Sequence, residues 1–311
     1  MNVHVSLRAL GYLVALAETR HFGRAAERCF VSQPTLSAQV KKLEDQLGVQ
    51  LVERGQQAML TDIGKRIVER ARRVLDEARE IEELARNFQD PLAGELRVGL
   101  IPTVAPYLLP HVAAPLHERF PRLKLLLMEQ QTHRLVELVR GGEVDVAVMA
   151  LPVPGERLLT RVLYEEPFVV AMPADHPLAR KQRLEVSELG GEDLLLLEDG
   201  HCLRDQALEV CRLAEIRETP DFRATSLETL RQMVAGGVGV TLMPRLAVDR
   251  PVYSPDSLVV RRFRAPEPSR TIAAAWRPGS AREDTIANLC GAIEELMAPV
   301  LARRPEYPPA Q

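Results

Sequence analysis

The chain has 311 residues, of which 46% are hydrophobic, and a formal net charge of −3 at pH 7. A chain of this length and composition has room for two or three domains with hydrophobic cores of their own. The slightly negative charge excludes a general electrostatic attraction to nucleic acid as the basis of function. No secretory leader is expected at the N-terminus, and no segment is expected to provide the roughly 20 apolar residues of a membrane span.

The four cysteines include no C-x-x-C pair. This predicts a protein of the reducing cytoplasm, in which any disulfide is transient and linked to redox chemistry. The sequence has no Ser-His-Asp signature, no metal-ligand pattern and no phosphate loop, so we expect neither an enzyme nor a cofactor. The run of glycines at 236–239 precedes a predicted strand instead of following one. It is therefore interpreted as a tight turn between a helix and a strand rather than as a nucleotide site.

Residues 1 to about 60 carry three helical patterns. The first repeats apolar side chains from Leu7 to Ala17 after a candidate N-cap, Ser6. The second is short and places Cys29 on its buried side. The third begins at Ser32 with a proline in its first turn and ends at Gly48. Its buried stripe is predicted to consist of Leu36, Val40, Leu43 and Leu47.

The third helix presents polar side chains at its start, as readout of the DNA major groove requires. Residues 51–55 then fit a wing, a short hairpin beside the helices. The predicted DNA contacts are Ser32, Gln33, Thr35, Ser37, Gln39, Lys41 and Arg54. Residues 1–60 contain 7 Lys/Arg and 5 Asp/Glu. Because that excess is small, these patterns alone leave a helix-turn-helix and a plain three-helix domain as alternatives.

Residues about 61–90 predict one long helix that begins after Thr61. Apolar residues recur along it at spacings of four and three, between charged residues, which is the heptad pattern of a helix that packs against another helix. These residues are Val74, Ala78, Ile81, Ala85 and Phe88. We therefore expect a dimerisation helix that spaces two recognition helices for a two-fold site. The alternative is a helix packed on its own domain.

Residues about 91–311 alternate strand patterns with helix patterns, which predicts an α/β domain with a largely parallel sheet. The first expected strands are 96–101, 123–128 and 144–149, with helices at 107–119 and 134–140. The second set is 168–172, 194–197, 222–224 and 238–242, followed by 271–276 and a final helix with Cys290 in the core. We expect two subdomains, about 91–166 with 268–311, and about 167–267. Such domains hold ligands in a cleft at the C-terminal ends of their strands.

Residues 198–206 place Cys202 between a buried strand and a predicted helix. Asp199 lies in the turn before this helix and can cap it. The partial positive charge at a helix N-terminus stabilises a thiolate, and His201 and Arg204 can add cations or hydrogen-bond donors. Cys202 is therefore the candidate nucleophile of the chain.

Cys211 follows Cys202 by nine residues on the same predicted helix. That spacing separates their Cα atoms by roughly 13 Å and puts them on opposite faces, whereas a disulfide requires about 4.4–6.8 Å. The two thiols can therefore form a disulfide only if the helix unwinds, which is the behaviour of a switch rather than of a structural crosslink. Taken alone, Cys211 also fits a small buried hydrophobic residue.

The N-terminal segment resembles the winged helix-turn-helix of LysR-type transcriptional regulators. The motifs that carry the resemblance are FGRAAE at 22–27, VSQPTLS at 31–37 and LEDQLG at 43–48. The resemblance implies a dimerisation helix and a two-subdomain, periplasmic-binding-protein-like (Rossmann-like) effector domain. The residues that it implies face DNA are Gln33, Thr35, Ser37 and Arg54. The family usually has an aromatic residue or leucine where this chain has Val52, which affects the packing of the wing.

Four further stretches are similar to the peroxide-sensing members of this family. They are GLIPTV at 99–104, QTH at 131–133, LEDGHCLRDQ at 197–206 with Cys211, and FRATSLETL at 222–230. The resemblance implies that Cys202 is the peroxidatic cysteine, which reacts with H2O2, and that Cys211 is the resolving one. The implied pocket around the peroxide and the thiolate consists of Thr103, Thr132, His201, Arg204 and Asp205.

As a whole, the resemblance implies a bacterial, cytoplasmic activator that binds double-stranded promoter DNA as a homotetramer, a dimer of dimers. Hydrogen peroxide is the implied signal, RNA polymerase the implied partner, and glutaredoxin or thioredoxin the implied reductant. Two alternatives stay open. One is a LysR regulator that senses a small organic anion and has idle cysteines, and the other is a thiol peroxidase with a DNA-binding domain.

Overall fold

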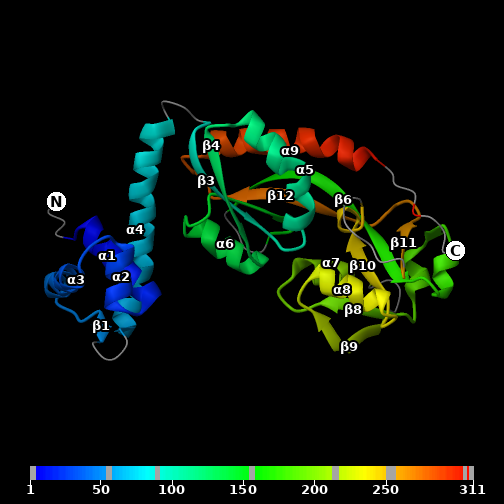
Figure 1. The fold of residues 1–311 in the computed structure, drawn as a ribbon, viewed down its shortest axis with the longest axis horizontal. Helices are drawn as coiled ribbons and strands as arrows, with labels where there is room; N and C mark the ends of the chain where they lie inside the picture. The colour runs from blue at the N-terminus through cyan, green and yellow to red at the C-terminus, as the bar shows by residue number, and fades with distance from the viewer. Residues whose placement is uncertain are drawn as a thin grey trace. The chain divides into compact units, whose positions relative to one another are not determined.

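The structure is a computed structural model that describes residues 5–53, 58–87, 92–153, 158–211, 217–249, 257–303 and 307. The chain divides into two compact units, residues 1–89 and residues 90–311. Each unit has a hydrophobic core of its own, one built around the N-terminal helices and the other around a large sheet. Figure 1 labels many of the elements of both units.

The smaller unit contains short helices, a two-stranded hairpin and one long helix. Its elements are α1 (Leu7–Thr19), α2 (Phe22–Arg28), α3 (Gln33–Leu47), β1 (Val52–Glu53), β2 (Met59–Leu60) and α4 (Asp62–Asn87). The predicted caps are confirmed, because Ser6 and Ser32 each accept a backbone N–H of the turn that follows them. Gly48 has the left-handed φ of 67° that ends α3.

The buried face of α3 explains why this segment is a helix. Leu36, Val40 and Leu43 are at most 1% exposed and belong to the core of the smaller unit. Leu47 was expected in the same stripe, but it is 37% exposed and does not belong to that core. The predicted stripe is therefore one residue too long.

The larger unit is built on an eight-stranded sheet with the order β4-β3-β5-β12-β6-β11-β7, in which β10 also pairs with β6. Its strands are β3 (Gly94–Leu100), β4 (Leu123–Glu129), β5 (Val146–Ala150), β6 (Leu159–Pro173), β7 (Arg183–Leu184), β10 (Thr241–Pro244), β11 (Leu258–Phe263) and β12 (Ser269–Trp276). Two further strands, β8 (Asp193–Leu197) and β9 (Arg217–Ala224), pair with each other in parallel.

The prediction of a largely parallel sheet is wrong for the strands at the centre. β12 runs antiparallel to both β5 and β6, and β6 runs antiparallel to β10 and β11. β6 is a single strand of 15 residues, which pairs with β12 in its first half and with β10 and β11 in its second. The larger unit has two lobes, which are the two subdomains expected from the sequence. The chain crosses from the first lobe to the second along β6 and returns along β12, so these two strands have opposite directions (Figure 1).

Helices pack against the two sheets of the larger unit. They are α5 (Ala105–Arg119), α6 (Thr132–Arg140), α7 (Cys202–Cys211), α8 (Leu227–Ala235) and α9 (Glu283–Ala302), with short 3-10 helices η1 (Pro177–Arg180), η2 (Val186–Leu189) and η4 (Arg245–Ala247). α9 packs on β6 and α5, α6 on β5, and α7 on β8. The turn expected at 236–239 is confirmed after α8, where Gly237 has a φ of 83°.

By length and composition α9 is apolar enough to cross a membrane. The expectation that no segment reaches that length is therefore wrong. In this structure the apolar face of α9 belongs to the core, because Ile286, Leu289, Cys290 and Ile293 are all at most 4% exposed. The core position predicted for Cys290 is confirmed.

Candidate functional site

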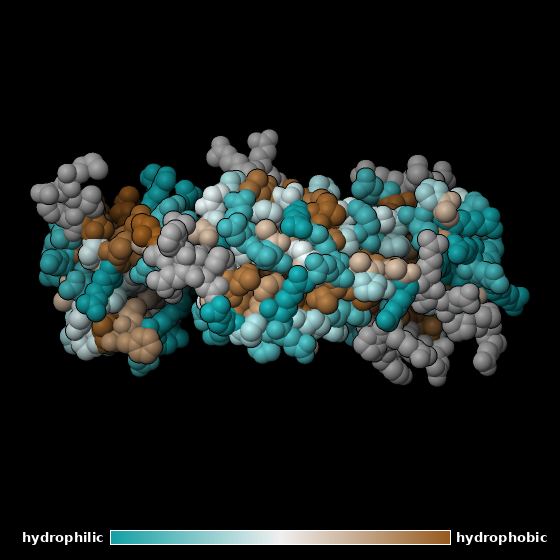
Figure 2. Space-filling model, turned by 90° about the horizontal axis from the view of Figure 1, so that it is seen from above, coloured by the Kyte–Doolittle hydropathy of each residue, from teal (hydrophilic) through white to brown (hydrophobic). Residues whose placement is uncertain are grey.

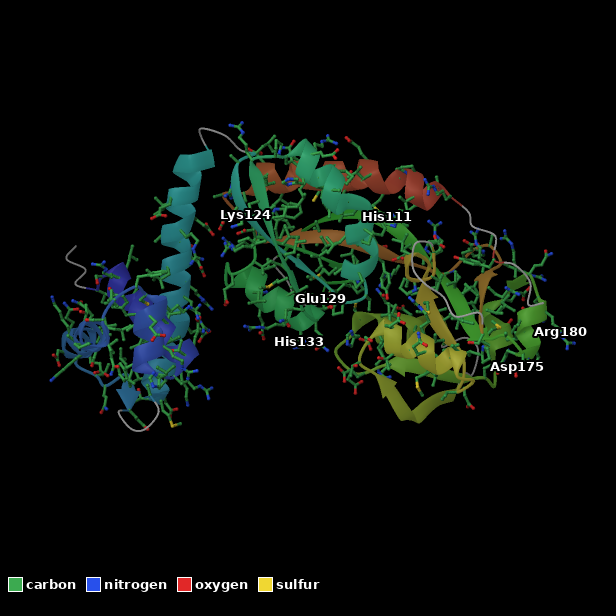
Figure 3. The ribbon with its side chains drawn as sticks, in the orientation of Figure 1. His111, Lys124, Glu129, His133, Asp175 and Arg180 are labelled. Atoms are coloured by element: carbon green, nitrogen blue, oxygen red, sulfur yellow. The ribbon has the colours of Figure 1, made fainter. Side chains whose placement is uncertain are left out.

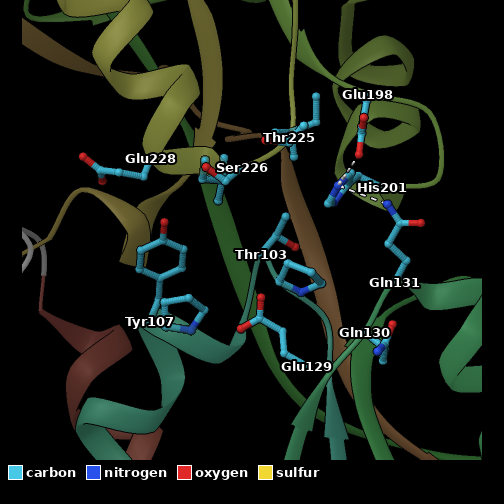
Figure 4. Close-up of a pocket in the computed structure, with 14 residues that line it drawn as sticks. Thr103, Tyr107, Glu129, Gln130, Gln131, Glu198, His201, Thr225, Ser226 and Glu228 are labelled. Carbon is cyan, nitrogen blue, oxygen red and sulfur yellow. Dashed lines mark hydrogen bonds and ion pairs between the residues drawn. The ribbon is translucent and has the colours of Figure 1, made fainter.

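A cleft of about 630 Å³ lies between the two lobes of the larger unit. Its walls come from four segments that each follow a strand: 102–107 after β3, 129–131 at the end of β4, 197–201 after β8 and 225–228 after β9. β3 runs parallel to β4, and β8 runs parallel to β9, so the carboxyl ends of both pairs meet at the cleft. Figure 4 shows side chains of the two lobes facing each other across it.

His201 forms part of the cleft wall and is only 6% exposed. Its Nε2 lies 3.4 Å from the amide nitrogen of Gln131 and 3.9 Å from Oε1 of Glu198 (Figure 4). Burial lowers the pKa of His201, because the imidazolium is disfavoured away from water, although Glu198 acts in the opposite direction. His201 is therefore neutral at neutral pH. Of the two roles predicted for it, hydrogen bonding fits this state and a positive charge does not.

Thr103 is held by a buried ion pair that the sequence did not indicate. Arg270 on β12 donates to the hydroxyl of Thr103 at 3.1 Å and to its carbonyl oxygen at 2.9 Å. The same guanidinium pairs with Glu166 on β6 at 2.7 Å, and both charged side chains are 1% exposed. The other oxygen of Glu166 accepts the N–H of Leu246 at 2.9 Å. Thr103 is thereby tied to both crossing strands and, through η4, to the second lobe.

The other predicted pocket residues lie at the starts of α6 and α7. Thr132 is 7% exposed, and its Oγ1 has no hydrogen-bond partner among the described residues. Arg204 is 8% exposed and pairs with Asp199 at 3.0 Å, so its charge is engaged by the turn before α7. Asp205 is exposed. Thr103 and His201 line the cleft, whereas Thr132, Cys202, Arg204 and Asp205 are not among its described lining residues.

The two cysteines of α7 lie at its two ends, and both are free thiols. Cys202 is half-buried and follows His201, whereas Cys211 is 4% exposed. Burial raises the pKa of Cys211 to about 11, because a thiolate is disfavoured away from water. Burial also raises the pKa of Cys290, to about 12, and that of Cys29. The thiolate is the reactive form, and Cys202 is the cysteine that lies at a helix N-terminus, where the partial positive charge stabilises a thiolate. Cys202 is therefore the candidate nucleophile.

The helix expected over both cysteines is present and intact. α7 runs from Cys202 to Cys211, which separates its ends by about 13 Å. Leu203, Arg204 and Ala207 between them are buried, and the helix packs against β8 and η2. A disulfide needs Cα atoms within about 4.4–6.8 Å. α7 must therefore open before the two thiols can meet.

The cleft is lined by more acidic than basic groups. Among its described lining residues, the acidic side chains are Glu129, Glu198 and Glu228, and the basic one is His201, which is neutral. Glu228 is paired with Arg231 at 2.9 Å, so a small organic anion would face the carboxylates of Glu129 and Glu198, while a neutral molecule such as H2O2 would not be repelled. Across the described residues, no group of three His, Cys, Asp or Glu side chains is placed to hold a metal ion.

The predicted DNA contacts lie along α3 and its N-cap in the smaller unit. Ser32, Gln33, Thr35 and Lys41 are exposed, and Ser37 and Gln39 are half-buried. The hydroxyl of Ser32 is engaged with that of Thr35 at 2.7 Å, so Ser32 shapes the start of the helix. Arg54 lies outside the described residues. The exposed polar groups at the start of α3 are available to contact the edges of bases.

The long helix α4 divides its apolar residues between two faces. One face of its first half packs on α1, as the alternative of a helix packed on its own domain requires. The predicted seam is nevertheless open to solvent: Val74 is 46% exposed and Ile81 is 69% exposed. Ala78 is half-buried, and the side chain of Ala85 and all of Phe88 lie outside the described residues. Exposed apolar residues along one helix are what a second copy would cover.

Two family models match the chain. A model described as a bacterial regulatory helix-turn-helix protein of the lysR family matches residues 7–65. A model described as the LysR substrate binding domain matches residues 89–298. The first match contains the three short helices and the hairpin, and the second contains the sheet and the cleft.

The chain is also similar to known proteins along nearly its whole length. It is 48% identical to a hydrogen peroxide-inducible genes activator of Pectobacterium carotovorum subsp. carotovorum, over 94% of this chain and 97% of that protein. It is 47% identical to the DNA-binding transcriptional dual regulator OxyR of Escherichia coli strain K12, over 94% of this chain and 96% of that protein. A solved full-length OxyR variant from Pseudomonas aeruginosa matches with a TM-score of 0.76 and 46% identity, covering 94% of this chain and 98% of that one.

Proposed function

Because this chain belongs to the LysR family of bacterial regulatory helix-turn-helix proteins, we propose that it is a peroxide-sensing transcriptional regulator. It binds DNA through the helix-turn-helix of the smaller unit and responds to H2O2 through Cys202. The observation that carries the proposal is the arrangement of α7, with a half-buried thiol directly after the cleft residue His201 and a buried thiol at the other end. The similarity to hydrogen peroxide-inducible activators over 94% of the chain supports the same function.

Cys202 is the group that reacts with the peroxide. Its thiolate attacks one oxygen of H2O2, the O–O bond breaks, and the departing hydroxide takes a proton to become water. Cys202 is thereby oxidised to a sulfenic acid. The N-terminus of α7 stabilises the thiolate. Thr103 and the neutral His201 hydrogen-bond the peroxide, and Thr132 adds a hydroxyl that has no other partner among the described residues.

Cys211 then resolves the sulfenic acid. Its sulfur attacks the sulfur of Cys202, an S–S bond forms, and the hydroxyl of the sulfenic acid leaves as water. Opening of α7 brings Cys211 within reach and also exposes it. Exposure lowers its pKa from about 11 toward the ordinary value of about 8.5. The same opening therefore supplies both proximity and reactivity, and it releases the packing of α7 on β8.

Assembly connects this switch to DNA. Two copies joined along the exposed stripe of α4 present two α3 helices to a two-fold operator, and two such dimers form a homotetramer. Repacking of the larger unit after oxidation changes how the tetramer holds promoter DNA and RNA polymerase. A glutaredoxin or thioredoxin of the bacterial cytoplasm reduces the disulfide and resets the protein.

A direct test adds one equivalent of H2O2 to the reduced protein and measures free thiols, peptide maps and a DNA footprint together. We expect two of the four thiols to disappear, a disulfide between residues 202 and 211, and an altered footprint. Cys202→Ser should abolish all three changes, whereas the control Cys29→Ala should keep them. An altered footprint with an organic anion and no loss of thiols would overturn the proposal. So would repeated peroxide turnover without any change in the footprint.

A further inference from the structure

The C-terminal end of α9 is held by a buried arginine, Arg245 of η4. Its guanidinium donates to the carbonyl oxygens of Val300 at 2.9 Å, Leu301 at 3.0 Å and Arg303 at 2.9 Å. The last carbonyls of a helix have no partner within the helix and carry a partial negative charge. A guanidinium at this place therefore satisfies the end of α9 and fixes it to η4.

Two further residues extend this contact, and we call Arg245, Asp249 and Tyr307 together the α9 anchor. Asp249 follows Arg245 by four positions, and its Oδ2 lies 3.2 Å from the Nε of Arg245. The hydroxyl of Tyr307 donates to Oδ1 of Asp249 at 2.7 Å. The anchor therefore joins residues at and beyond the end of α9 to the residues that follow β10.

The anchor places a charge in the interior of the larger unit. Lys124, Asp175 and Arg180 are exposed at the periphery of this unit (Figure 3), and Figure 2 shows hydrophilic residues over much of its surface. Arg245, in contrast, is 2% exposed. A buried charge is costly unless it is paired and hydrogen-bonded. The three carbonyls and Asp249 supply these partners, so the anchor holds η4 in one arrangement.

The short helix η4 connects the anchor to the cleft. The N–H of Leu246, the residue after the anchor arginine, donates to Glu166 at 2.9 Å. Glu166 pairs with Arg270 at 2.7 Å, and Arg270 donates to the hydroxyl of Thr103 at 3.1 Å. η4 also packs on β6 and on α5, which begins two residues after Thr103. The position of Thr103 therefore depends on where the anchor holds η4.

We propose that Arg245 is a positioning residue for the reaction of Cys202 with H2O2. By fixing η4 to the end of α9, it holds Glu166, and through it Arg270 and Thr103, in the arrangement that hydrogen-bonds the peroxide. Arg245 itself is not among the described residues that line the cleft. The inference rests on the function proposed for Cys202, because it concerns the same reaction. Small displacements of a positioning group slow a reaction steeply.

The test compares two reagents for Cys202 in the reduced, full-length protein. Oxidation of residue 202 by H2O2 and its alkylation by iodoacetamide are followed over time by peptide mapping. Arg245→Met should slow the oxidation about tenfold, because the peroxide depends on the placement of Thr103. It should leave the alkylation unchanged, because iodoacetamide requires only the thiolate.

Two further variants accompany Arg245→Met. Tyr307→Phe removes one hydroxyl of the anchor and should slow the oxidation by a smaller factor, about threefold. Arg161→Gln is the matched control, because Arg161 also holds α9, through Glu294 at 2.7 Å, but from the first half of β6. It should react with both reagents like the wild type.

A double-mutant cycle shows whether Arg245 acts through Thr103. Thr103→Val removes the hydroxyl with little change in shape. In that background Arg245→Met should slow the oxidation further by less than about twofold, because the two changes affect one interaction. A further tenfold loss would show that the two residues act independently, and it would overturn the proposal.

Other results would also overturn it. One is a folded Arg245→Met variant that is oxidised as fast as the wild type. Another is an equal loss of both rates, since that would place the effect on Cys202 itself. If Arg245→Met does not fold by circular dichroism, Tyr307→Phe decides, and wild-type oxidation of that variant contradicts the proposal. A wild-type Cys202 that does not react with H2O2 would instead overturn the proposed function.

Discussion

Cys202 and Cys211 carry the same thiol group nine residues apart, yet the protein gives them different surroundings. Cys202 is half-buried at the start of α7, while burial raises the pKa of Cys211 to about 11. The same physical effect keeps His201 neutral. Desolvation favours the uncharged form of each group, so the position of a side chain in the fold decides which residues are reactive before any peroxide arrives.

His201 predicts how stability depends on pH. Its pKa in the folded protein lies below the unfolded value of about 6.5, so the unfolded state binds more protons in acid. The contribution of His201 to the free energy of unfolding is therefore fully present above about pH 6.5. It is lost as the pH falls through the pKa of the folded state. His201→Gln should flatten this part of the profile in thermal unfolding between about pH 5 and 8. His133→Gln, at an exposed histidine, should not, and equal slopes for His201→Gln and wild type would contradict the prediction.

Gln33 tests the assignment of α3 as the recognition helix. Its exposed amide at the start of α3 can form a pair of hydrogen bonds with one base edge. Gln33→Ala should reduce discrimination at one base pair by about 1–3 kcal/mol in binding titrations with operator variants. Gln46→Ala, at an exposed position near the other end of α3, serves as the control. If Gln33→Ala discriminates between operators as the wild type does, another residue reads the DNA.

At the scale of elements, α7 is both a structural helix and an obstacle to the disulfide. Its buried residues join the core through β8, and its length separates the two thiols. Oxidation must break this packing, at a cost within the range of local opening energies. A disulfide formed against such a cost is readily reduced, as a regulatory disulfide should be.

Hydrogen exchange can detect the opening of α7. After oxidation of the wild type, amides across 202–211 should exchange faster, while those of α8 keep their protection. Cys211→Ser should still form a sulfenic acid at Cys202 but lack the lasting increase in exchange. If peptide mapping shows the disulfide while these amides stay equally protected, the two thiols meet by a route that leaves the helix intact.

At the scale of the whole molecule, the proposed function depends on copies of the chain acting together. α4 packs one face on its own unit and leaves Val74 and Ile81 exposed. Burying such residues against a second copy is favourable, because each large aliphatic side chain contributes roughly 1.5–3 kcal/mol when fully buried. The free energy gained by burying these residues in a dimer along α4 would therefore offset the entropic cost of ordering two DNA-binding units on one operator.

Ile81→Glu tests this assembly. A charge in an apolar helix seam is costly to bury, so the variant should sediment as a smaller species than the wild type and bind operator DNA more weakly. The free energy of unfolding of the isolated chain should change little, since Ile81 is 69% exposed. Glu82→Gln, one position further along α4, is the matched control. If Ile81→Glu sediments like the wild type, the exposed apolar residues of α4 do not form the interface between copies.

Local features of this protein could be predicted from its sequence. The caps at Ser6, Ser32 and Gly48 and the continuous helix from Cys202 to Cys211 depend on interactions between residues within a few positions of one another. Such interactions depend only on which residues are close to one another in the sequence. The resemblance to LysR regulators has the same origin, because its motifs are short runs of adjacent residues.

By itself, then, the sequence determined the helices, the caps, the family and the separation of the two thiols. Only the tertiary structure decided the antiparallel β6 and β12, the exposure of Leu47, the neutral state of His201 and the ion pair that holds Thr103. Arg270 and Thr103 are 167 positions apart in the chain, and no periodicity links them. Burial and pairing of this kind depend on which strands become neighbours, and that is set by packing of the whole fold rather than by any local pattern.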